Sequence, residues 1–393
     1  MANCCEYKNS KNRTRNVLQC FCECDKVDES FDKMFNGENI PESEWDMMLN
    51  DMADRVRIPW PGGAKKVSIY LFLVPIIYNL IFFIATFSFN VTIISIFFLI
   101  IYIIRTSIIN MNNVKHSRSK FLLCWTYWSI YYAMKEYYYV LRFKILVGKG
   151  VENNDNSMQD NINFSFGTII CDLLCISLII VSIFLQITDP GKVEGVNPPR
   201  GTDARSLRNY YLVHKDYRLK YCRITNMPIK RYDHFCIWIS KPIGFGNHRW
   251  FLLFLILMSI GTFLFSYFLM DLIGNNQNHK IRNYDYYNFS RLYHENRSTY
   301  EFAIFLYVFI CFFGIIGLLS KQIYLISKNV TTYESIHFKT LFSDDIDLAW
   351  DQQVDYLKVL AQSAASRSPR RSVRTRIGEF HLVRNWLKFL KLI

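Results

Sequence analysis

Long runs of apolar residues, separated by polar segments, constrain the fold of this chain more than any other feature. A bilayer's hydrocarbon core is about 30 Å thick, and about 20 residues of apolar helix can cross it. By that measure we expect six spans, at about 67–86, 90–109, 121–142, 165–187, 250–273 and 301–326. The predicted fold is therefore an all-α polytopic membrane protein with six transmembrane helices.

The third predicted span has the weakest apolar signal, because Lys135 and Glu136 lie within it. Adjacent residues do not face each other on a helix, so the two charges are not expected to pair. A span that packs inside a bundle tolerates such residues. Without this span, the orientation of every later segment would be inverted.

Charge sets the expected orientation. The 46 Lys and Arg residues exceed the 33 Asp and Glu residues and give a formal net charge of +13. Such a charge suits either nucleic acid or loops on the cytosolic side of a membrane, and the spans favour the second. The basic segments around Lys65–Lys66, in 192–231 and in 367–376 then lie on the cytosolic side, with both termini. We expect the arginines of the tail to meet anionic lipid and no nucleic acid partner.

The spans divide the chain into five parts, and no internal repeat is apparent. We expect a cytosolic arm with Cys clusters (1–66), helices one to four (67–187), a cytosolic loop (188–249), helices five and six with a lumenal loop (250–326), and a cytosolic tail (327–393). Sequons at Asn288 and Asn296 agree with a lumenal 274–300. An amphipathic helix is expected near 344–360.

The central loop carries a possible nucleophile. Cys236 lies two residues after His234, whose ring can accept the thiol proton, and Asp233 can orient that ring. Lysines and arginines around these residues favour a reactive thiolate. The alternative is a solvated basic loop with an incidental Cys and His, and composition by itself favours that alternative.

Four motifs lie in order along the chain and strengthen the first interpretation. They are Asp189-Pro190-Gly191 after the fourth span, Asp233-His234-Phe235-Cys236 followed by Trp238, Gly244 and Asn247, Thr331-Thr332-Tyr333-Glu334 after the last span, and Gly378 with Asn385-Trp386 and Phe389 near the C-terminus. Together they resemble the motifs of the DHHC protein S-acyltransferases, membrane enzymes that attach palmitate to protein cysteines. The N-terminal arm and the ending "RNWLKF" resemble an animal subgroup described as interacting with neuronal nitric oxide synthase.

The resemblance implies an activity and a role for each candidate residue. Palmitate would pass from palmitoyl-CoA to Cys236 and then to cysteines of target proteins, at a membrane of the Golgi or endoplasmic reticulum. His234 would be the base, oriented by Asp233, and Trp238 would line the acyl-CoA entrance. Arg218, Lys220 and Arg231 are candidates for the CoA phosphates. Structural support is expected from Asp189, from Thr332 against Asp233, and from Asn385, which would fix the tail against the catalytic loop.

The sequence departs from this family at its zinc ligands. The family loop holds two zinc ions in Cys₃His sites, and a closed site needs all four ligands. An ungapped comparison puts these residues at the ligand positions: Arg208, Tyr211, Tyr221, Cys222, Thr225, Pro228, Phe235 and Pro242. Only Cys222 can bind metal, so we expect no zinc. We expect Tyr211, Tyr221, Phe235 and Trp238 to pack in its place.

Alternatives to an S-acyltransferase stay open. The first is a catalytically silent membrane scaffold that binds partners through its arm and tail. A transporter would show paired broken spans in two halves, and the sequence has no such symmetry. The cysteines at 4, 5, 20, 22 and 24 admit acylation, metal binding or no role, and acylation or no role is favoured over metal.

Overall fold

The structure is a computed structural model that describes residues 6–8, 14–16, 32–33, 35–36, 56–59, 61, 63–112, 120–142, 157–195, 218–275, 293, 299–336 and 382–390. It divides into two compact units, residues 1–80 and 81–393. Several predictions fall outside the described residues: those on the N-terminal cysteines, Arg208, Tyr211, the sequons, Gly378, the helix near 344–360 and the basic segment 367–376.

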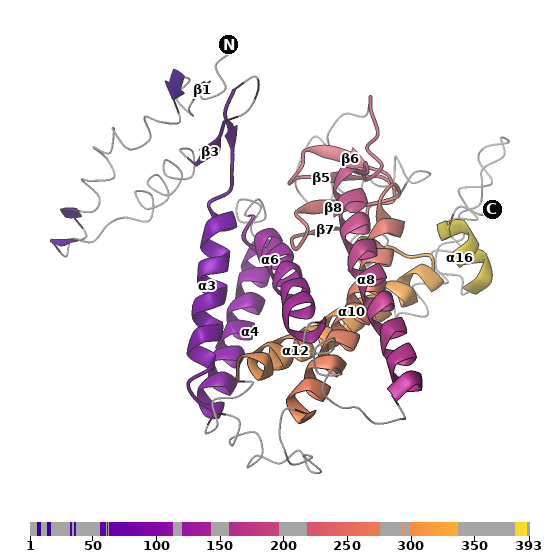
Figure 1. The fold of residues 1–393 in the computed structure, drawn as a ribbon. Coiled ribbons are helices and arrows are strands. Elements are labelled where there is room, and N and C mark those ends of the chain that lie inside the picture. Colours follow the sequence, from indigo (N-terminus) through magenta and orange to yellow (C-terminus); the bar gives the residue numbers. More distant parts are fainter. Residues whose placement is uncertain are drawn as a thin grey trace, which may run out of the picture. The chain divides into compact units, whose positions relative to one another are not determined.

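The first unit contains two small antiparallel sheets and the start of an apolar helix (Figure 1). Strand β1 (Glu6–Lys8) pairs with β2 (Thr14–Asn16), and β3 (Arg57–Ile58) pairs with β4 (Lys65–Lys66). Helix α3 (Tyr70–Ala85) follows and contains Pro75. Proline lacks an N–H, and membrane helices compensate with side-chain hydrogen bonds. Here Asn79 Nδ2 donates to the Pro75 carbonyl oxygen at 2.8 Å.

The second unit is mostly helical. Its helices are α4 (Phe89–Asn112), α6 (Phe121–Glu136) with the π-helical turn η2 (Tyr137–Arg142), α8 (Ser157–Ile187), α10 (His248–Asn275), α12 (Thr299–Ser327), α13 (Thr332–Ile336) and α16 (Leu382–Leu390). Between α8 and α10 lie β5 (Lys220–Cys222), β6 (Met227–Ile229), β7 (His234–Cys236) and β8 (Lys241–Ile243). The all-α prediction thus omitted the short hairpins of the loop.

Four described helices are long and apolar enough to cross a membrane: Phe89–Ile109, Thr168–Ile187, His248–Met270 and Thr299–Ser327. They correspond to the second, fourth, fifth and sixth predicted spans. The first predicted span contains the shorter apolar helix Tyr70–Ala85. The third contains α6 and η2, and its two charges lie at the end of α6, where Lys135 Nζ is 4.0 Å from Glu136 Oε1. The expectation that these two side chains do not meet is therefore wrong.

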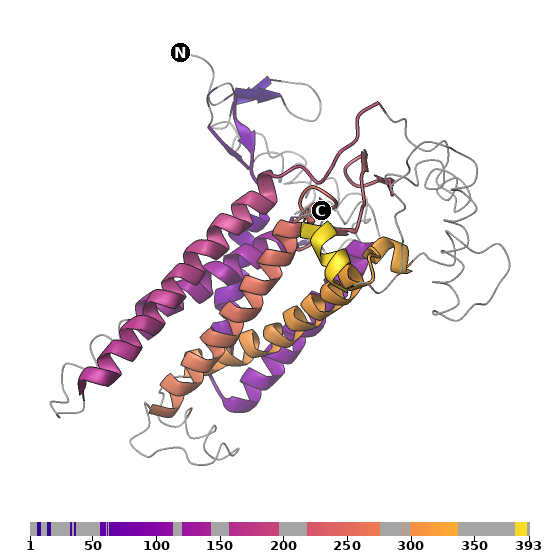
Figure 2. The ribbon, with the colours of Figure 1, turned by 90° about the vertical axis from the view of Figure 1, so that its right-hand side faces the viewer.

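Helix α10 packs against both α8 and α12, and Figure 2 shows it between them. It begins at His248, five residues after β8 ends at Ile243, so the hairpins lie at its N-terminal end. Helix α12 runs antiparallel to α10 and ends at Ser327, and α16 packs against it there. The end of α8, the start of α10 and the end of α12 therefore meet at the hairpins.

Candidate active site

The loop between α8 and α10 is built from two hairpins of the same design. Strands β5 and β6 pair antiparallel, with Tyr221 opposite Pro228, and β7 and β8 pair in the same register, with Phe235 opposite Pro242. The turns end at Asn226 and Ser240, whose φ angles are 53° and 50°. Residues 220–229 and 234–243 are thus a structural repeat, which is not apparent in the sequence because the two segments share few positions, namely a Cys, a Pro and an Ile.

The motif Asp189-Pro190-Gly191 holds both hairpins to the end of α8. Asp189 Oδ1 accepts the N–H groups of Gly191 and Lys192 at 2.7 and 2.8 Å, which closes a turn. The carbonyl of Gly191 accepts the Lys230 N–H at 2.9 Å, and that of Pro190 accepts the Gly246 N–H at 3.2 Å. The motif therefore bonds to the ends of both hairpins.

Two glycines allow this close contact. A Cβ atom on Gly244 would lie 2.5 Å from the Pro190 carbonyl oxygen, and one on Gly246 would overlap the Asp189 carbonyl oxygen. Lys241 Nζ adds a link from β8, because it donates to the carbonyl oxygens of Gln186 and Thr188 at the end of α8. The second hairpin is thereby fixed at the end of this membrane helix.

Asp233, between the hairpins, is completely buried and fully hydrogen-bonded. Its Oδ1 accepts the Thr332 N–H at 2.7 Å, and its Oδ2 accepts the Thr332 hydroxyl at 2.8 Å. His234 Nδ1 also donates to Oδ2 at 2.7 Å. Burial by itself would raise the pKa of Asp233, but His248, His234 and the Thr332 N–H outweigh it and hold the pKa below its usual 3.8. Asp233 is therefore a carboxylate at neutral pH.

His234 is held in one orientation by this bond. Because Nδ1–H donates to Asp233, Nε2 is the ring nitrogen left to interact with Cys236, two residues on in the same strand. Burial would lower the pKa of His234, but the hydrogen bonds and charges of Asp233 and Cys236 raise it to about 10. Its ring also contacts Phe251 edge-on, with centroids 5.3 Å apart. The imidazole is thus oriented on both sides.

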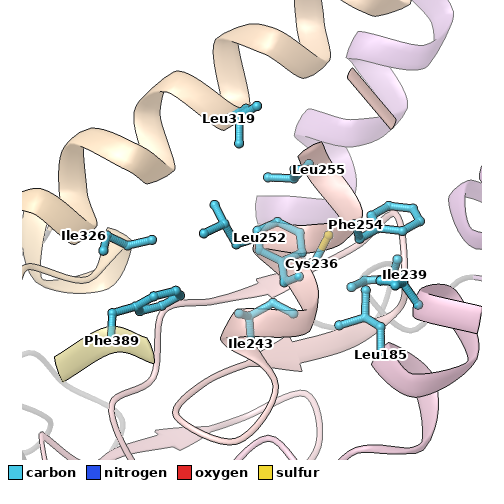
Figure 3. Packing of buried hydrophobic residues seen from close by; sticks show 12 residues of the cluster. Leu185, Cys236, Ile239, Ile243, Leu252, Phe254, Leu255, Leu319, Ile326 and Phe389 are labelled. Carbon is cyan, nitrogen blue, oxygen red and sulfur yellow. The ribbon is translucent and has the colours of Figure 1, made fainter. Parts of the chain in front are cut away.

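Cys236 lies in an apolar cluster and is 7% exposed. The cluster is drawn from α8, the second hairpin, α10, α12 and α16, and Figure 3 shows the sulfur among Leu185, Leu252, Phe254 and Ile239. Trp238, expected at the acyl-CoA entrance, is partly buried and packs against the same cluster. The thiol of Cys236 is therefore surrounded by apolar side chains, and its polar neighbour is His234 from the same strand.

Arg218 was predicted to bind CoA phosphates, but the structure gives it another role. It is 5% exposed, and its guanidinium donates to both carboxylate oxygens of Glu334, with Nε–Oε1 at 2.6 Å. Its remaining donors reach Asn329 Oδ1 and the Asn329 carbonyl oxygen at 3.2 and 3.1 Å. A buried guanidinium with these partners ties β5 to α13 and is not presented to a phosphate.

Lys220 and Arg231 also contact the protein. Lys220 Nζ lies 4.9 Å and 3.3 Å from the ring centroids of Tyr232 and Tyr333, and burial lowers the pKa of its amine to about 7. This amine is a weak candidate for a phosphate ligand. Arg231 Nη2 donates to Asn329 Oδ1 at 2.8 Å, while the side chain is partly exposed and its Nε has no partner among the described residues. Because this Nε atom is itself buried, it is not presented to a phosphate.

Asn385 was predicted to fix the tail against the catalytic loop, and its bond lies elsewhere. Its Nδ2 donates to the Ser327 carbonyl oxygen at 2.6 Å, and Trp386 Nε1 donates to Ser327 Oγ at 3.1 Å. Both bonds attach α16 to the end of α12. The contact with the catalytic region comes from Phe389, which packs in the Cys236 cluster and lies edge-on to His248 at 5.1 Å.

Two buried residues of the site were not predicted. Gln322, on α12, donates to Asp233 Oδ2 at 3.1 Å, and His248, at the start of α10, is 2.9 Å from Gln322 Oε1. Polar residues inside apolar spans usually have a functional or packing role. The sequence signal for this residue was the presence of a polar glutamine, Gln322, within the apolar run 301–326.

The described hairpins do not offer zinc sites. Among the described residues there is no group of three or more His, Cys, Asp or Glu that could hold a metal ion. Tyr221 faces Pro228 across the first hairpin and Phe235 faces Pro242 across the second, and none of these four side chains is a zinc ligand. The residues that the structure describes in this loop therefore do not supply the two Cys₃His sites that the resemblance implies.

Comparisons with known proteins agree with the geometry. The DHHC palmitoyltransferase family matches residues 202–339. The mouse protein palmitoyltransferase ZDHHC23 is 24% identical over 304 residues, which cover 64% of this chain and 65% of that protein, so the chain spans slightly less than two thirds of its length.

More distant relatives match a shorter part of the chain. Protein S-acyltransferase 8 of Arabidopsis thaliana is 28% identical over 138 residues, which cover 34% of this chain and 31% of that protein. Palmitoyltransferase AKR1 of Eremothecium gossypii is 30% identical over 170 residues, covering 39% of this chain and 23% of that protein. With the motifs in order around one hairpin site, these matches lead to one conclusion: the part of the chain that bears the site, residues 202–339, is similar to the DHHC palmitoyltransferase family.

Proposed function

We propose that the protein is an S-acyltransferase that moves palmitate from palmitoyl-CoA to cysteine thiols of target proteins, with Cys236 as the acyl carrier. One observation carries the proposal: the 2.7 Å bond between His234 Nδ1 and the buried Asp233 carboxylate, in the strand that bears Cys236. The names of the mouse, plant and fungal relatives support the reaction class.

In the first step Cys236 becomes acylated. The proton of the Cys236 thiol resides on His234 Nε2 as an imidazolium, and the thiolate sulfur attacks the thioester carbonyl carbon of palmitoyl-CoA. The bond from that carbon to the CoA sulfur breaks, and CoA leaves as a thiol with the proton from His234. Asp233 stays ionised throughout and stabilises the imidazolium.

In the second step the acyl group passes to a target cysteine. His234 deprotonates the incoming thiol, the new sulfur attacks the acyl carbon, and Cys236 is released with the proton. The same imidazole serves both steps because its Nδ1–H remains bonded to Asp233. The enzyme returns to its starting state, which makes the reaction a double displacement.

The apolar cluster supports a lipid substrate. Cys236 packs with Leu185, Leu252 and Phe254 at the ends of apolar helices. An acyl chain bound there would be surrounded by apolar side chains. Trp238 packs against this cluster, and we assign it to the entrance for the acyl-CoA thioester. We assign a CoA phosphate to Arg231, whose partly exposed side chain supports that role.

We further propose six spans, cytosolic termini, and a location in the Golgi or endoplasmic reticulum. The four long apolar helices and the basic segments beside them support the orientation. On this basis membrane lipids surround the site, and anionic lipid meets the basic tail. We also propose that the loop folds without zinc, as its aromatic and proline pairs support.

A catalytically silent scaffold is the second candidate. The loss of zinc ligands and the 7% exposure of Cys236 favour it, because a carrier cysteine needs access to its substrates. Such a protein would keep the fold and bind partners without acyl transfer.

Acyl labelling separates the two. Purified full-length protein is incubated with labelled palmitoyl-CoA, and hydroxylamine lability identifies a thioester. We expect a labile label that is absent from Cys236→Ser. The matched control is Cys222→Ser, which changes the cysteine at the same position of the other hairpin and is expected to keep the label. A folded wild-type protein that takes no label would favour the scaffold.

A further inference from the structure

Two buried polar side chains lie behind Asp233 and have no place in the acyl-transfer steps. Gln322 comes from α12 and His248 from α10, and each is 5% exposed. A buried polar group is costly unless its hydrogen bonds are made, so an amide and an imidazole here require a reason.

The directions of their hydrogen bonds follow from counting donors. Gln322 Nε2 has two hydrogens and lies 3.1 Å from Asp233 Oδ2 and 3.2 Å from Thr332 Oγ1. The Thr332 hydroxyl hydrogen goes to Asp233, so Thr332 Oγ1 accepts from Gln322. Gln322 Oε1 is then an acceptor, and the His248 Nε2 atom at 2.9 Å must carry a hydrogen. The amide of Gln322 therefore has a single consistent orientation.

This chain of bonds fixes one carboxylate oxygen. Asp233 Oδ2 accepts from His234, Thr332 and Gln322. Without Gln322, only His234 and the Thr332 hydroxyl would donate to Oδ2. Because Gln322 belongs to α12 and His248 to α10, the bonds also tie the carboxylate to two packed membrane helices.

We propose that Gln322 and His248 are positioning residues that hold the Asp233 carboxylate in line with His234. The part of this proposal that concerns acyl transfer rests on the proposed function. The alignment of Asp233 with His234 does not rest on it. The titratable groups that act on the pair are Cys236 and Arg231 from the hairpin region and His248 from α10, and none of them takes over the donor role of the neutral Gln322.

Alkylation of Cys236 tests the alignment without any acyl substrate. In the full-length protein, the rate of modification by iodoacetamide is followed against pH on the tryptic peptide 232–249, in which Cys236 is the sole cysteine. Titration of His234 changes the reactivity of the neighbouring sulfur and gives an inflection at about pH 10 in the wild type. In Gln322→Met, which keeps the length but lacks the donor, we expect the inflection to move down toward about pH 6.5, the ordinary histidine value.

Two further variants make the result decisive. Gln186→Met is the matched control, because Gln186 also donates two hydrogen bonds, at 3.0 and 3.1 Å, but to Ile239 and Tyr127 and not to a carboxylate. It is expected to leave the inflection in place. His248→Phe removes the donor to Gln322 and is expected to move the inflection in the same direction as Gln322→Met. It provides the test if Gln322→Met does not fold. An unmoved inflection in folded Gln322→Met, or an equal shift in Gln186→Met, overturns the proposal.

The acyl-transfer readout is separate. If the wild type takes up label, Gln322→Met is expected to lower the acylation rate constant about tenfold or more, since a small misplacement of a catalytic group costs up to about a hundredfold. The KM for palmitoyl-CoA is expected to stay the same, because Gln322 does not contact the substrate. A rise in KM with an unchanged rate constant contradicts a positioning role. A wild type that takes no label contradicts the proposed function and leaves the alkylation result to decide on the alignment.

Discussion

At the scale of residues, partners decide what each charged side chain does. Arg218 and Arg231 are both near the site, and both donate to Asn329. The guanidinium of Arg218 also pairs with the Glu334 carboxylate, whereas the buried Nε of Arg231 has no partner among the described residues. Asp233 and His234 shift each other's pKa in opposite directions. The carboxylate stabilises the imidazolium and raises the pKa of His234, while the imidazolium stabilises the carboxylate and lowers the pKa of Asp233. Sequence neighbours supply these groups, but the contacts set their protonation.

The first residue-scale prediction concerns pH and stability. The pKa of His234 is raised from 6.5 to about 10 in the folded protein. A raised pKa stabilises the fold fully below 6.5, and that stabilisation is lost as the pH rises through about 10. We therefore expect the difference in melting temperature between wild type and His234→Gln to be largest near pH 6 and to shrink toward pH 10. A difference that is constant or grows with pH contradicts the pairing.

Asp233 sets the acid limit of the same window. Its folded pKa lies below the usual 3.8, so its contribution is present above that value and is lost as the pH falls through the lowered pKa. Between these limits both partners are charged. The pair thus contributes over the neutral range in which the protein is proposed to act.

At the scale of elements, two hairpins and one turn form the unit that positions the site. The hairpins repeat one design, but only the second carries His before its Cys, and the first carries Lys220 at that place. The turn Asp189-Pro190-Gly191 accepts N–H groups from the ends of both. This arrangement depends on a backbone approach that leaves no room for a side chain at Gly246.

Gly246→Ala is the element-scale prediction. The added Cβ meets a backbone oxygen, which cannot move aside as a side chain can, so we expect a loss of about 1–3 kcal/mol in stability and slower acyl labelling. The matched control is Gly261→Ala in α10, where a Cβ meets nothing within 4 Å. Alanine there favours the helix and is expected to leave the melting temperature unchanged or higher. Equal losses in both variants contradict the role of the turn.

At the scale of the whole molecule, the apolar helices and the loop together form the surroundings of Cys236. Within residues 81–393, α10 contributes His248 and the apolar wall of Cys236, and α12 contributes Gln322 and Leu319. The α16 helix adds Phe389 to the same cluster. The loop is held by the Arg218–Glu334 pair, the turn after α8 and the helix ends.

Metal removal is the prediction at this scale. A structural zinc site contributes on the order of 10 kcal/mol to the folding of a small domain, so a chelator lowers the stability of a zinc-dependent loop strongly. Here we expect no change in melting temperature with a chelator, and metal analysis of the purified protein is expected to find no stoichiometric zinc. About two zinc ions per chain would contradict this account of the ligand positions.

The sequence by itself determined the apolar spans and the order of the motifs, because both depend on local composition and spacing. Four long helices lie where spans were expected, and the similarity of residues 202–339 to the family rests on motifs that are each short and contiguous in the chain. Thr332 was expected beside Asp233 through the resemblance, and the contact between them is present. The residue types at the family's zinc-ligand positions can likewise be read from the sequence, and the absence of zinc stays a prediction.

Only the tertiary structure decided which polar groups meet. Gln322 lies far along the chain from Asp233, and their bond requires that α12 end beside the second hairpin. The burial of Arg218 by Glu334 and the attachment of Asn385 to Ser327 depend on the same convergence of helix ends. Hydrogen bonds act over about 3 Å, so they are set by packing in space and not by spacing along the sequence.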